Sequence, residues 1–362
     1  MRVAVDISIC AFNRAGSARY AGALLETLQR EANHAEITVV PLSLPSTLAA
    51  TAAGPKRKAV TLFWELVYAP ILLPRLCQRH GCDLLHTTIP TPICALPYPV
   101  VTTVHDVIPI LYPQWFPPVM GRRLRRWLRV AMSHATHVIA NSQNTAQDLA
   151  PFAPHVPITA IYPGSLLASP ASPLPAPRGE HSYILCVGTL EPRKNLGTVL
   201  EAYRLLVEQE ANVPDLLVVG AADWMASDVQ EYAQRLGIAE RVRLAGFVSD
   251  DELQSLYQQA TMLVYPSLYE GFGFPPLEAM SNGCPVIVSN VSSLPEVVGE
   301  AGVLVEPTDA AKLAGAIHQL LSDPKRADLL RERGYAQARR FSWGRCARET
   351  ISVYRQAFEG RS

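Results

Sequence analysis

Residues 262–278 read MLVYPSLYEGFGFPPLE. The segment Met262–Tyr265 is a short apolar run of the length typical of a buried strand. A glycine-containing loop follows, and then Pro275 and Pro276, which suit the first turn of a helix because that turn does not need their missing N–H groups. The stretch therefore predicts a strand, a loop and a helix in succession, the repeating unit of a parallel α/β sheet.

The same alternation of strands and helices runs through the whole chain. In the first half, the strand-like segments are Arg2–Ser8, Ile37–Pro41, Asp83–Thr87, Val100–His105, His137–Ala140 and Thr159–Tyr162. In the second half, they are Ser182–Val187, Leu216–Gly220, Val242–Ala245, Met262–Tyr265, Val286–Ser289 and Gly302–Val305. Helical or turn-like sequence separates them. The sequence thus predicts an α/β protein with two doubly wound domains.

Chain length and one proline-rich segment indicate how the domains are arranged. With 362 residues, the chain exceeds the size at which a single core usually stops growing. Residues 163–180, PGSLLASPASPLPAPRGE, are rich in proline and lack periodicity, which is typical of a stiff linker. We predict domains over residues 1–165 and 181–343, with a Pro-rich linker at 166–180. A C-terminal helix at 344–362 is expected to return to the first domain.

Composition narrows the class of protein. The 32 basic and 32 acidic residues give a formal net charge of zero, which argues against a nucleic-acid partner. The seven cysteines include no C-x-x-C pair, so buried free thiols in a reducing cytoplasm are expected. Residues 1–6, MRVAVD, begin a strand and lack the signal-peptide layout. The most apolar stretch, Leu62–Leu73, is shorter than a membrane span and favours a core or interfacial helix.

Two loops that follow predicted strands carry candidate chemistry. Gly271 and Gly273 leave backbone amides exposed ahead of a helix start, a geometry that holds oxygen-rich or anionic groups. A turn that only stabilises the helix N-terminus is the alternative. In residues 187–195, VGTLEPRKN, Arg193 and Lys194 stand near another helix start and suit a diphosphate. A solvated basic pair at a turn is the alternative there.

Three segments resemble a known family in the order in which they occur: EGFGFPPLEAM (270–280), NGCPVIVSN (282–290) and SSLPEVVGEAG (292–302). They resemble the E-x7-E region of retaining GT-B glycosyltransferases of family 4, the group 1 transferases, and in particular mannosyltransferase-like members. The resemblance covers nearly the whole chain. It implies two Rossmann-like domains that face a central cleft, and an enzyme that transfers a hexose from a nucleoside-diphospho-sugar.

The resemblance also implies roles in the second domain. Glu270 is expected to contact hydroxyls of the transferred sugar, and Glu278 the ribose hydroxyls of the nucleotide. The backbone amides of Gly271, Phe272, Gly273 and Phe274 are expected to face the sugar and the diphosphate. The segment with Gly188 and Thr189 resembles the family's phosphate-binding loop, and the loop with Phe247 and Val248 is expected to edge the base with backbone groups. Many relatives carry an arginine where this chain has Thr189, so Arg193 is expected to take its place beside Lys194.

In the first domain, the segment TTVHDVIP (102–109) resembles the loop in which a histidine lies beside the donor sugar. His105 is therefore a candidate catalytic residue, although a lone histidine also suits a satisfied core position. Asp106 is expected either to orient its imidazole or to cap a turn. Gly16, Arg19 and Tyr20 match part of the Gly-x-Gly-Arg-Tyr loop of the family. Gly16 is expected near the donor, and Arg19, Tyr20 and Asp106 on the acceptor side.

The resulting functional hypothesis is a retaining hexosyltransferase that acts in polysaccharide biosynthesis. Glu270, His105, Arg193 and Lys194 are its candidate catalytic residues. No Asp-x-Asp follows a predicted strand, so neither a metal nor another cofactor is expected. The His105 segment favours GDP-mannose over UDP-glucose as donor, and the acceptor is expected to be a glycan or lipid-linked hydroxyl. A sugar-nucleotide epimerase and a non-catalytic sugar-nucleotide-binding protein remain alternatives.

The segment Gly121–Val130 carries five arginines and no acid, from Arg122 to Arg129. Leu124, Trp127 and Leu128 share one helical face in this segment. A basic amphipathic helix with tryptophan is typical of a membrane interface. The segment predicts a cytoplasmic enzyme bound peripherally to the anionic inner face of a membrane. A helix packed in the core, with its arginines in water, is the alternative.

Overall fold

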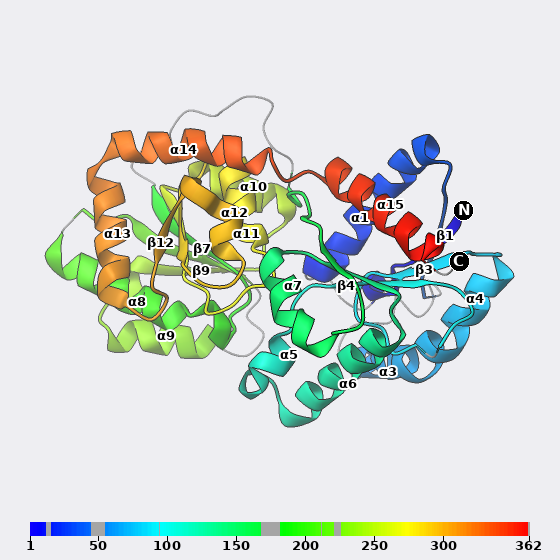
Figure 1. Cartoon of the computed structure of the whole chain (residues 1–362). Helices are drawn as coiled ribbons and strands as arrows, with labels where there is room; N and C mark the ends of the chain where they lie inside the picture. The colour runs from blue at the N-terminus through cyan, green and yellow to red at the C-terminus, as the bar shows by residue number, and fades with distance from the viewer. Residues whose placement is uncertain are drawn as a thin grey trace. The chain divides into compact units, whose positions relative to one another are not determined.

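The computed structural model describes residues 1–11, 16–44, 55–93, 95–167, 182–210, 212–220 and 226–360. The chain divides into two compact units. Unit 1 comprises Met1–Leu166 and Phe341–Ser362, and unit 2 comprises Leu167–Arg340. Each unit contains its own six-stranded parallel sheet (Figure 1). Most of the predicted linker, from residue 168 onward, lies outside the described residues.

Unit 1 is built on a sheet in the order β2-β1-β3-β4-β5-β6. Its strands are β1 (Arg2–Asp6), β2 (Thr38–Leu42), β3 (Leu84–Thr87), β4 (Val100–Val104), β5 (His137–Ala140) and β6 (Ile158–Ala160). Its helices include α1 (Gly16–Ala35), α3 (Pro55–Phe63), η2 (Trp64–Leu72), α4 (Leu73–Arg79), α5 (Ile108–Leu111), α6 (Pro118–His134), α7 (Gln143–Leu149) and α15 (Trp343–Glu359). The strand order reverses between β1 and β3, so ligand-binding loops are expected where these two strands end.

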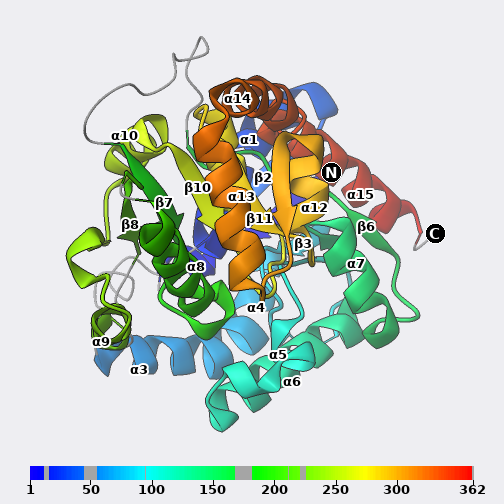
Figure 2. The ribbon, with the colours of Figure 1, turned by 90° about the vertical axis from the view of Figure 1, so that its left-hand side faces the viewer.

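The C-terminal helix α15 packs against α1, as Figures 1 and 2 both show. Its first residue, Trp343, donates from Nε1 to the carbonyl of Ser165 at 2.8 Å. Near its other end, the Tyr354 hydroxyl lies 2.6 Å from Nδ1 of His86 in β3. The C-terminal part of unit 1 thus begins at Phe341, a few residues before the predicted boundary at 344. The rings of Phe341 and Trp343 already pack against Tyr162 and Tyr20 of the same unit.

Helices α3, η2 and α4 form one continuous helical stretch. Among the described residues, its part Ala59–Arg79 is the one helix long and apolar enough to cross a membrane, judged by length and composition alone. The sequence predicted a core or interfacial helix at Leu62–Leu73, a stretch too short for a membrane span, and the helix extends beyond it at both ends. Trp64, Tyr68 and Leu73 nevertheless lie buried in the core of unit 1. The middle segment, η2, is a π-helix that accommodates Pro70.

Helix α6 corrects part of the membrane prediction. Trp127 and Leu128 are buried, and Leu124 packs partly buried against the same core. Trp127 also donates to Oε1 of Glu65 in η2 at 2.7 Å. The apolar face that was expected to meet a membrane is therefore a core face, because α6 packs on η2 and the sheet.

Unit 2 contains a sheet in the order β12-β11-β10-β7-β8-β9. Its strands are β7 (Tyr183–Val187), β8 (Asp215–Val219), β9 (Val242–Gly246), β10 (Met262–Tyr265), β11 (Val286–Ser289) and β12 (Gly302–Val305). Its helices include α8 (Leu196–Gln209), α9 (Ala226–Arg235), α10 (Asp250–Gln259), α11 (Phe274–Ser281), α12 (Leu294–Val298), α13 (Ala310–Ser322) and α14 (Pro324–Ala338). Counted in chain order, this is the 3-2-1-4-5-6 arrangement of dinucleotide-binding folds.

Local sequence explains where the helices of unit 2 begin. Ser249 and Glu252 form a reciprocal capping box at the start of α10. Asp309 and Asp323 cap α13 and α14 by accepting backbone N–H groups. Helix α11 begins with prolines in its first turn, as its sequence predicts. These caps fix the helix starts that follow the strands and so position the loops between them.

Candidate active site

The candidate site of unit 2 lies at the carboxyl ends of β7 and β10. These two strands are neighbours, but the chain leaves β7 toward β8 and leaves β10 toward β11. A crevice opens at such a switch point because the two crossovers diverge. The segments that follow the strands are 188–195 and 266–273, which contain both loops singled out in the sequence.

Gly188 is the first residue of the first loop, and its backbone packs closely against the end of β8. Its N–H donates to the carbonyl of Val219, the last residue of β8, at 2.9 Å. A Cβ on the next residue, Gly220, would lie 1.8 Å from the carbonyl oxygen of Gly188. Gly188 itself has a φ of +148°, which favours glycine. The turn after β7 is therefore held tightly against the end of β8.

The rest of this loop is held by side chains. Thr189 donates its hydroxyl to Oε1 of Glu191 at 2.6 Å, and Oε2 of Glu191 lies 3.0 Å from Nε of Arg193. Asn195 is left-handed, with a φ of +58°, and donates to the carbonyl of Pro266 beyond β10 at 3.1 Å. Thr189 therefore stabilises the orientation of Arg193 through Glu191, and Asn195 ties the loop to the end of β10.

Glu270 is the centre of the site. Its Oε2 lies 2.7 Å from Nη1 of Arg193, and its Oε1 lies 2.6 Å from Nζ of Lys194. Tyr265, the last residue of β10, donates its hydroxyl to the same Oε1 at 2.8 Å. Lys194 also hydrogen-bonds to this hydroxyl and lies 4.7 Å from the centroid of the Tyr265 ring. The tertiary structure thus brings three of the predicted catalytic residues into one cluster.

Electrostatics fix the charge of this cluster. Burial alone raises the pKa of Glu270, but Arg193 and Lys194 outweigh burial and hold that pKa at about 2. Burial lowers the pKa of Lys194 to about 8, against the opposing attraction of Glu270. Glu270 is therefore an ionised carboxylate near neutral pH, and it accepts hydrogen bonds rather than donating a proton.

Two serines that precede α12 hold the backbone of the glycine loop. The N–H of Glu270 donates to Oγ of Ser292 at 2.9 Å. The hydroxyl of Ser293 lies 3.0 Å from the carbonyl of Glu270 and 2.5 Å from that of Phe272. Gly273 has a φ of +117° and caps α11. Sequence analysis quoted the serine segment only as part of the resemblance and missed its structural role, as it missed Tyr265 at the end of its strand.

The other predicted donor residues lie nearby in the fold of unit 2. Glu278 is buried in α11, where its Oε2 accepts from the Tyr257 hydroxyl at 3.2 Å. The rings of Phe272 and Phe274 meet edge to face, with centroids 5.2 Å apart. Phe247, which follows β9, is 78% exposed and lies next to Val248. Phe247 is thus a large apolar side chain left open to a ligand or to water.

In unit 1, His105 follows β4 and is half-buried. Its Nε2 lies 2.9 Å from the carbonyl of Thr88, so Nε2 carries the proton and Nδ1 is the acceptor of the neutral ring. Burial lowers the pKa of His105 to about 4, so the ring is neutral at physiological pH. Asp106 accepts a hydrogen bond from the backbone N–H of Ile108 at 3.0 Å. This contact caps a turn, which is the second of the two roles expected for Asp106.

The predicted acceptor-side residues of α1 differ in exposure. Tyr20 is fully buried, and its ring lies edge-on to His105 with centroids 4.7 Å apart. It therefore packs against His105, and its acceptor-side role stays a prediction. Arg19 donates to the carbonyl of Leu166 at 3.3 Å. Gly16 is the first residue of α1, so the segment that resembles the Gly-x-Gly-Arg-Tyr loop is already helical there. Residues 12–15 lie outside the described part of the chain.

Within the described residues, no group of three or more His, Cys, Asp or Glu side chains is arranged to hold a metal ion. The cations at the site of unit 2 are the side chains of Arg193 and Lys194. Together with the helix that begins at Leu196, they form a positive environment suited to phosphate oxygens.

Comparison with known proteins agrees with this architecture. The family model described as glycosyl transferases group 1 matches residues 175–337, and the model described as Glycosyltransferase Family 4 matches residues 14–165. O-antigen chain mannosyltransferase B of Escherichia coli is 35% identical over 265 residues, which are 70% of this chain and 70% of that protein.

Solved structures share the fold at lower sequence identity. Sucrose-phosphate synthase of Thermosynechococcus elongatus superposes with a TM-score of 0.75 at 23% identity, and covers 99% of this chain and 100% of its own. HepE of Anabaena, solved with UDP and glucose, gives a TM-score of 0.69 at 18% identity over 98% of this chain and 100% of its own. The chain belongs to the group 1 glycosyltransferases, family 4, and is an enzyme of the GT-B fold.

Proposed function

We propose that this glycosyltransferase moves mannose from GDP-mannose to a hydroxyl of a glycan or lipid-linked acceptor in polysaccharide biosynthesis, with retention of the anomeric configuration. The observation that carries the proposal is the cluster of Glu270 with Arg193 and Lys194 at the switch point of unit 2. The similarity to a protein named as an O-antigen mannosyltransferase supports mannose as the transferred sugar.

The proposed division of labour follows from charge. An ionised carboxylate has about four acceptor positions, and the contacts of Glu270 with Arg193, Lys194 and Tyr265 occupy three of them. One position is left for a sugar hydroxyl. Arg193 and Lys194 supply positive charge for the diphosphate as it leaves, an electrostatic contribution that often dominates catalysis. Glu278 is proposed to bind the ribose hydroxyls.

Retention is proposed to proceed on one face of the sugar. The bond from the anomeric carbon to the diphosphate oxygen breaks, and that oxygen takes the proton of the acceptor hydroxyl as the new glycosidic bond forms. In this scheme Glu270 does not act as an acid, because its pKa is about 2. His105 is proposed to act as a neutral hydrogen-bonding group, since the pKa of its ring is about 4.

The donor is tested by thermal shift with GDP, GDP-mannose, UDP and UDP-glucose. A bound ligand raises stability by RT ln(1 + [L]/Kd), so the true donor shifts the melting temperature most. We expect GDP-mannose to give the largest shift. A larger shift with UDP-glucose would replace the proposed donor.

Transfer itself is tested by NMR of the product formed with a mannosylated acceptor. An α-linked product from the α-configured donor is expected, and a β-linked product would contradict retention. Conversion of the donor without an acceptor would indicate an epimerase, and donor binding without turnover a non-catalytic binder. Activity is expected to persist in excess chelator, and its loss would overturn the proposal that no metal takes part.

A cytoplasmic location is proposed as well. The described cysteines are free thiols, and Cys77, Cys82, Cys186, Cys284 and Cys346 are buried. Cys10 is exposed, in contrast to the buried thiols that the sequence led us to expect, and Cys94 lies outside the described residues. Free thiols are in keeping with a reducing compartment. Fractionation with thiol labelling of intact and broken cells tests the location.

A further inference from the structure

Thr88 lies at the point in unit 1 where three strands end. It is the first residue after β3, and it is fully buried. Its hydroxyl donates to the carbonyl of Asp6, the last residue of β1, at 2.8 Å. Its own carbonyl lies 2.9 Å from Nε2 of His105, which follows β4. One residue thus connects the carboxyl ends of β1, β3 and β4, beside the point where the strand order reverses.

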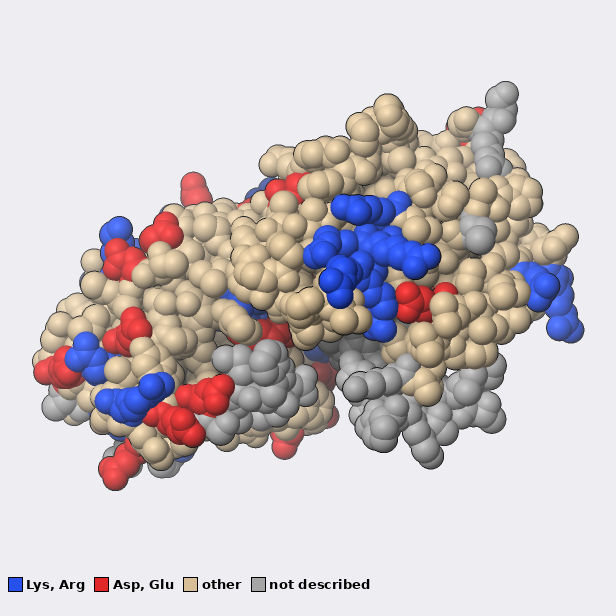
Figure 3. All heavy atoms as spheres, turned by 90° about the horizontal axis from the view of Figure 1, so that it is seen from below, with Lys and Arg blue, Asp and Glu red and all other residues tan. Residues whose placement is uncertain are grey.

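Asp6 is itself held in place by the helical segment η2. Charged side chains at the surface, such as those gathered in Figure 3, are solvated, whereas the carboxylate of Asp6 is buried. Its Oδ1 accepts the N–H of Ser8 at 3.0 Å and lies 3.4 Å from the Tyr68 hydroxyl. Trp64 donates from Nε1 to the Ser8 hydroxyl at 2.7 Å. Because these hydrogen bonds are shielded from water, the end of β1 is a firm anchor for Thr88.

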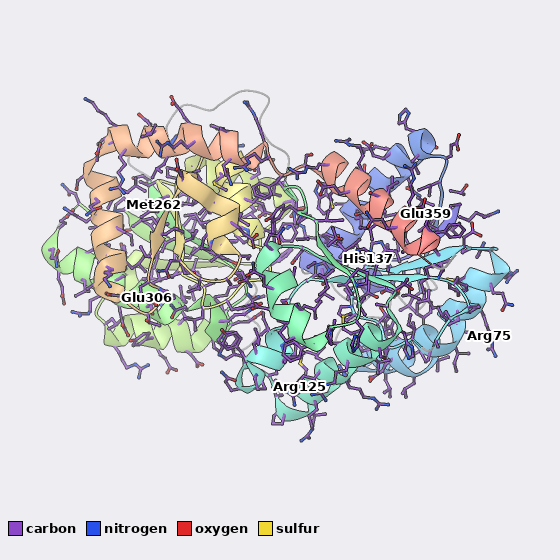
Figure 4. All side chains as sticks on the ribbon, in the orientation of Figure 1. Arg75, Arg125, His137, Met262, Glu306 and Glu359 are labelled. Carbon is purple, nitrogen blue, oxygen red and sulfur yellow. The ribbon has the colours of Figure 1, made fainter. Side chains whose placement is uncertain are left out.

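The contact between Thr88 and His105 differs in kind from that of another buried histidine of unit 1. Figure 4 labels His137 in β5, and its Nε2 lies 2.8 Å from the Thr159 hydroxyl. A hydroxyl can donate or accept, so it leaves the tautomer of the ring open. A carbonyl only accepts. The carbonyl of Thr88 therefore requires that Nε2 of His105 carry the proton.

Two further contacts of His105 leave its tautomer undetermined. The ring of Tyr20 lies edge-on to the imidazole, and Thr145 donates to the backbone carbonyl of His105 at 3.4 Å. These contacts restrict where the ring lies, but neither is a hydrogen bond to a ring nitrogen. Within the described part of the chain, the hydrogen bond that selects one tautomer of His105 is the one with Thr88.

We propose that Thr88 is a positioning residue for the transfer reaction. Its carbonyl holds the His105 ring in one orientation and one tautomer, and its hydroxyl anchors that carbonyl to the end of β1. His105 enters here as a group of the proposed catalytic site, so the role of Thr88 rests on the proposed function. Support of this kind affects rate because a misplacement of about 1 Å in an active site can cost roughly 100-fold.

Thr88→Val keeps the shape of the side chain and removes the hydroxyl. The new methyl would start 2.8 Å from the carbonyl oxygen of Asp6, whereas a carbon and an oxygen approach only to about 3.3 Å. Residue 88 must therefore shift by roughly half an ångström, and its carbonyl moves relative to Nε2 of His105. We expect kcat to fall by about tenfold. Affinity for GDP should not change, because the proposed nucleotide site lies in unit 2.

Two further variants separate positioning from a general structural role. Thr88→Ser keeps the hydroxyl and should retain most of kcat. Thr87→Val makes the same change one residue earlier, at an equally buried threonine whose hydroxyl lies 3.0 Å from that of Thr102. This bond joins β3 to β4 without His105, so kcat should stay near the native value even where the melting temperature falls. Equal losses of kcat in the two Thr→Val variants, or no advantage of Thr88→Ser over Thr88→Val, would overturn the proposal.

The hydrogen bond itself is measured by ¹H–¹⁵N NMR of the full chain with labelled histidine, without donor or acceptor. An imidazole N–H held by a carbonyl exchanges slowly with water, so the native chain should show an Nε2–H signal for His105. Its absence from His105→Gln assigns it among the nine histidines. The signal should broaden or vanish in Thr88→Val and persist in Thr87→Val. No such signal in the native chain, or an unchanged signal in Thr88→Val, would show that Thr88 does not hold the ring.

Failure of this proposal is distinguishable from failure of the proposed function. The NMR signal needs no turnover, so a donor other than GDP-mannose would leave its expected behaviour unchanged. If the signal responds to Thr88→Val while kcat does not, His105 takes no part in transfer and Thr88 is not a positioning residue for it. The role proposed for Glu270 would stand in that case, because its contacts lie in unit 2.

Discussion

At the scale of single residues, the site depends on one carboxylate shared among three donors. Glu270 accepts from Arg193, Lys194 and Tyr265, and this arrangement fixes both its charge and its orientation. Glu278, eight positions later, lies in a different environment inside α11, where Tyr257 is its hydrogen-bond donor. Two carboxylates from one motif thus have different hydrogen-bond donors and different surroundings.

This difference predicts different effects of two matched substitutions. Glu270→Gln should lower turnover roughly 100- to 1000-fold, the usual effect of losing one transition-state contact. Its affinity for GDP should not fall, because Arg193 and Lys194 remain. Glu278→Gln should weaken GDP binding. Calorimetry with GDP, alongside initial rates, separates the two effects. An equal loss of GDP affinity in both variants would contradict the assignment.

Tyr265 is predicted to position Lys194 and Glu270. Its hydroxyl contacts both groups, and a hydrogen bond to a charged group contributes about 1.5–3 kcal/mol. Tyr265→Phe should therefore lower kcat by about tenfold or more while the KM for the donor changes little. A structural role alone would lower the melting temperature without this separation of kcat from KM. The control is Tyr183→Phe, since the Tyr183 hydroxyl donates to the carbonyl of Leu256, away from the site.

At the scale of elements, strand ends determine where the loops can lie. Gly188, Gly220 and Gly246 each end or follow one of three neighbouring strands. The N–H of Gly188 donates to the carbonyl of Val219, and the N–H of Gly220 donates to the carbonyl of Gly246, each at 2.9 Å. At Gly220 the backbone approach is close enough to exclude a side chain. The loop that carries Arg193 and Lys194 is thus positioned by the strand next to it as well as by its own residues.

Gly220→Ala is predicted to displace the turn after β7. The new Cβ would lie 1.8 Å from the carbonyl oxygen of Gly188, so the turn must shift. Overpacking of this kind costs about 1–3 kcal/mol, and GDP affinity should fall with it. Gly315→Ala in α13 is the control, because nothing lies within 4 Å of its Cβ position. That variant should keep GDP affinity and gain up to about 1 kcal/mol of stability. Unchanged GDP affinity in Gly220→Ala would contradict the prediction.

At the scale of the whole molecule, unit 1 contains residues from both ends of the chain. His86 in β3 joins them, because its Nδ1 lies 2.6 Å from the Tyr354 hydroxyl of α15 and its Nε2 lies 2.8 Å from the Thr103 hydroxyl of β4. Burial lowers the pKa of His86 to about 3. A neutral, fully buried histidine therefore connects the C-terminal helix to the sheet.

This arrangement predicts acid sensitivity in unit 1. The unfolded chain binds protons on His86 and His105 below about pH 6.5, whereas the folded chain does so only near pH 3 and 4. The free energy of unfolding should thus fall as pH drops below 6.5, by up to about 1.4 kcal/mol per pH unit for each histidine. Urea unfolding between pH 7.5 and 5, followed by tryptophan fluorescence, measures the slope. His86→Gln should have a shallower slope, and parallel profiles would contradict the assignment.

The sequence by itself determined the fold class, the positions of the strands and the motifs of the site. Strand periodicity and proline at a helix start are local properties, so they are readable at Met262–Tyr265 and in the first turn of α11. Only the tertiary structure decided that Arg193 and Lys194 reach Glu270, because strand order sets which loops become neighbours. It also decided which face of α6 is core, since an amphipathic pattern looks the same whether a sheet or a membrane covers it.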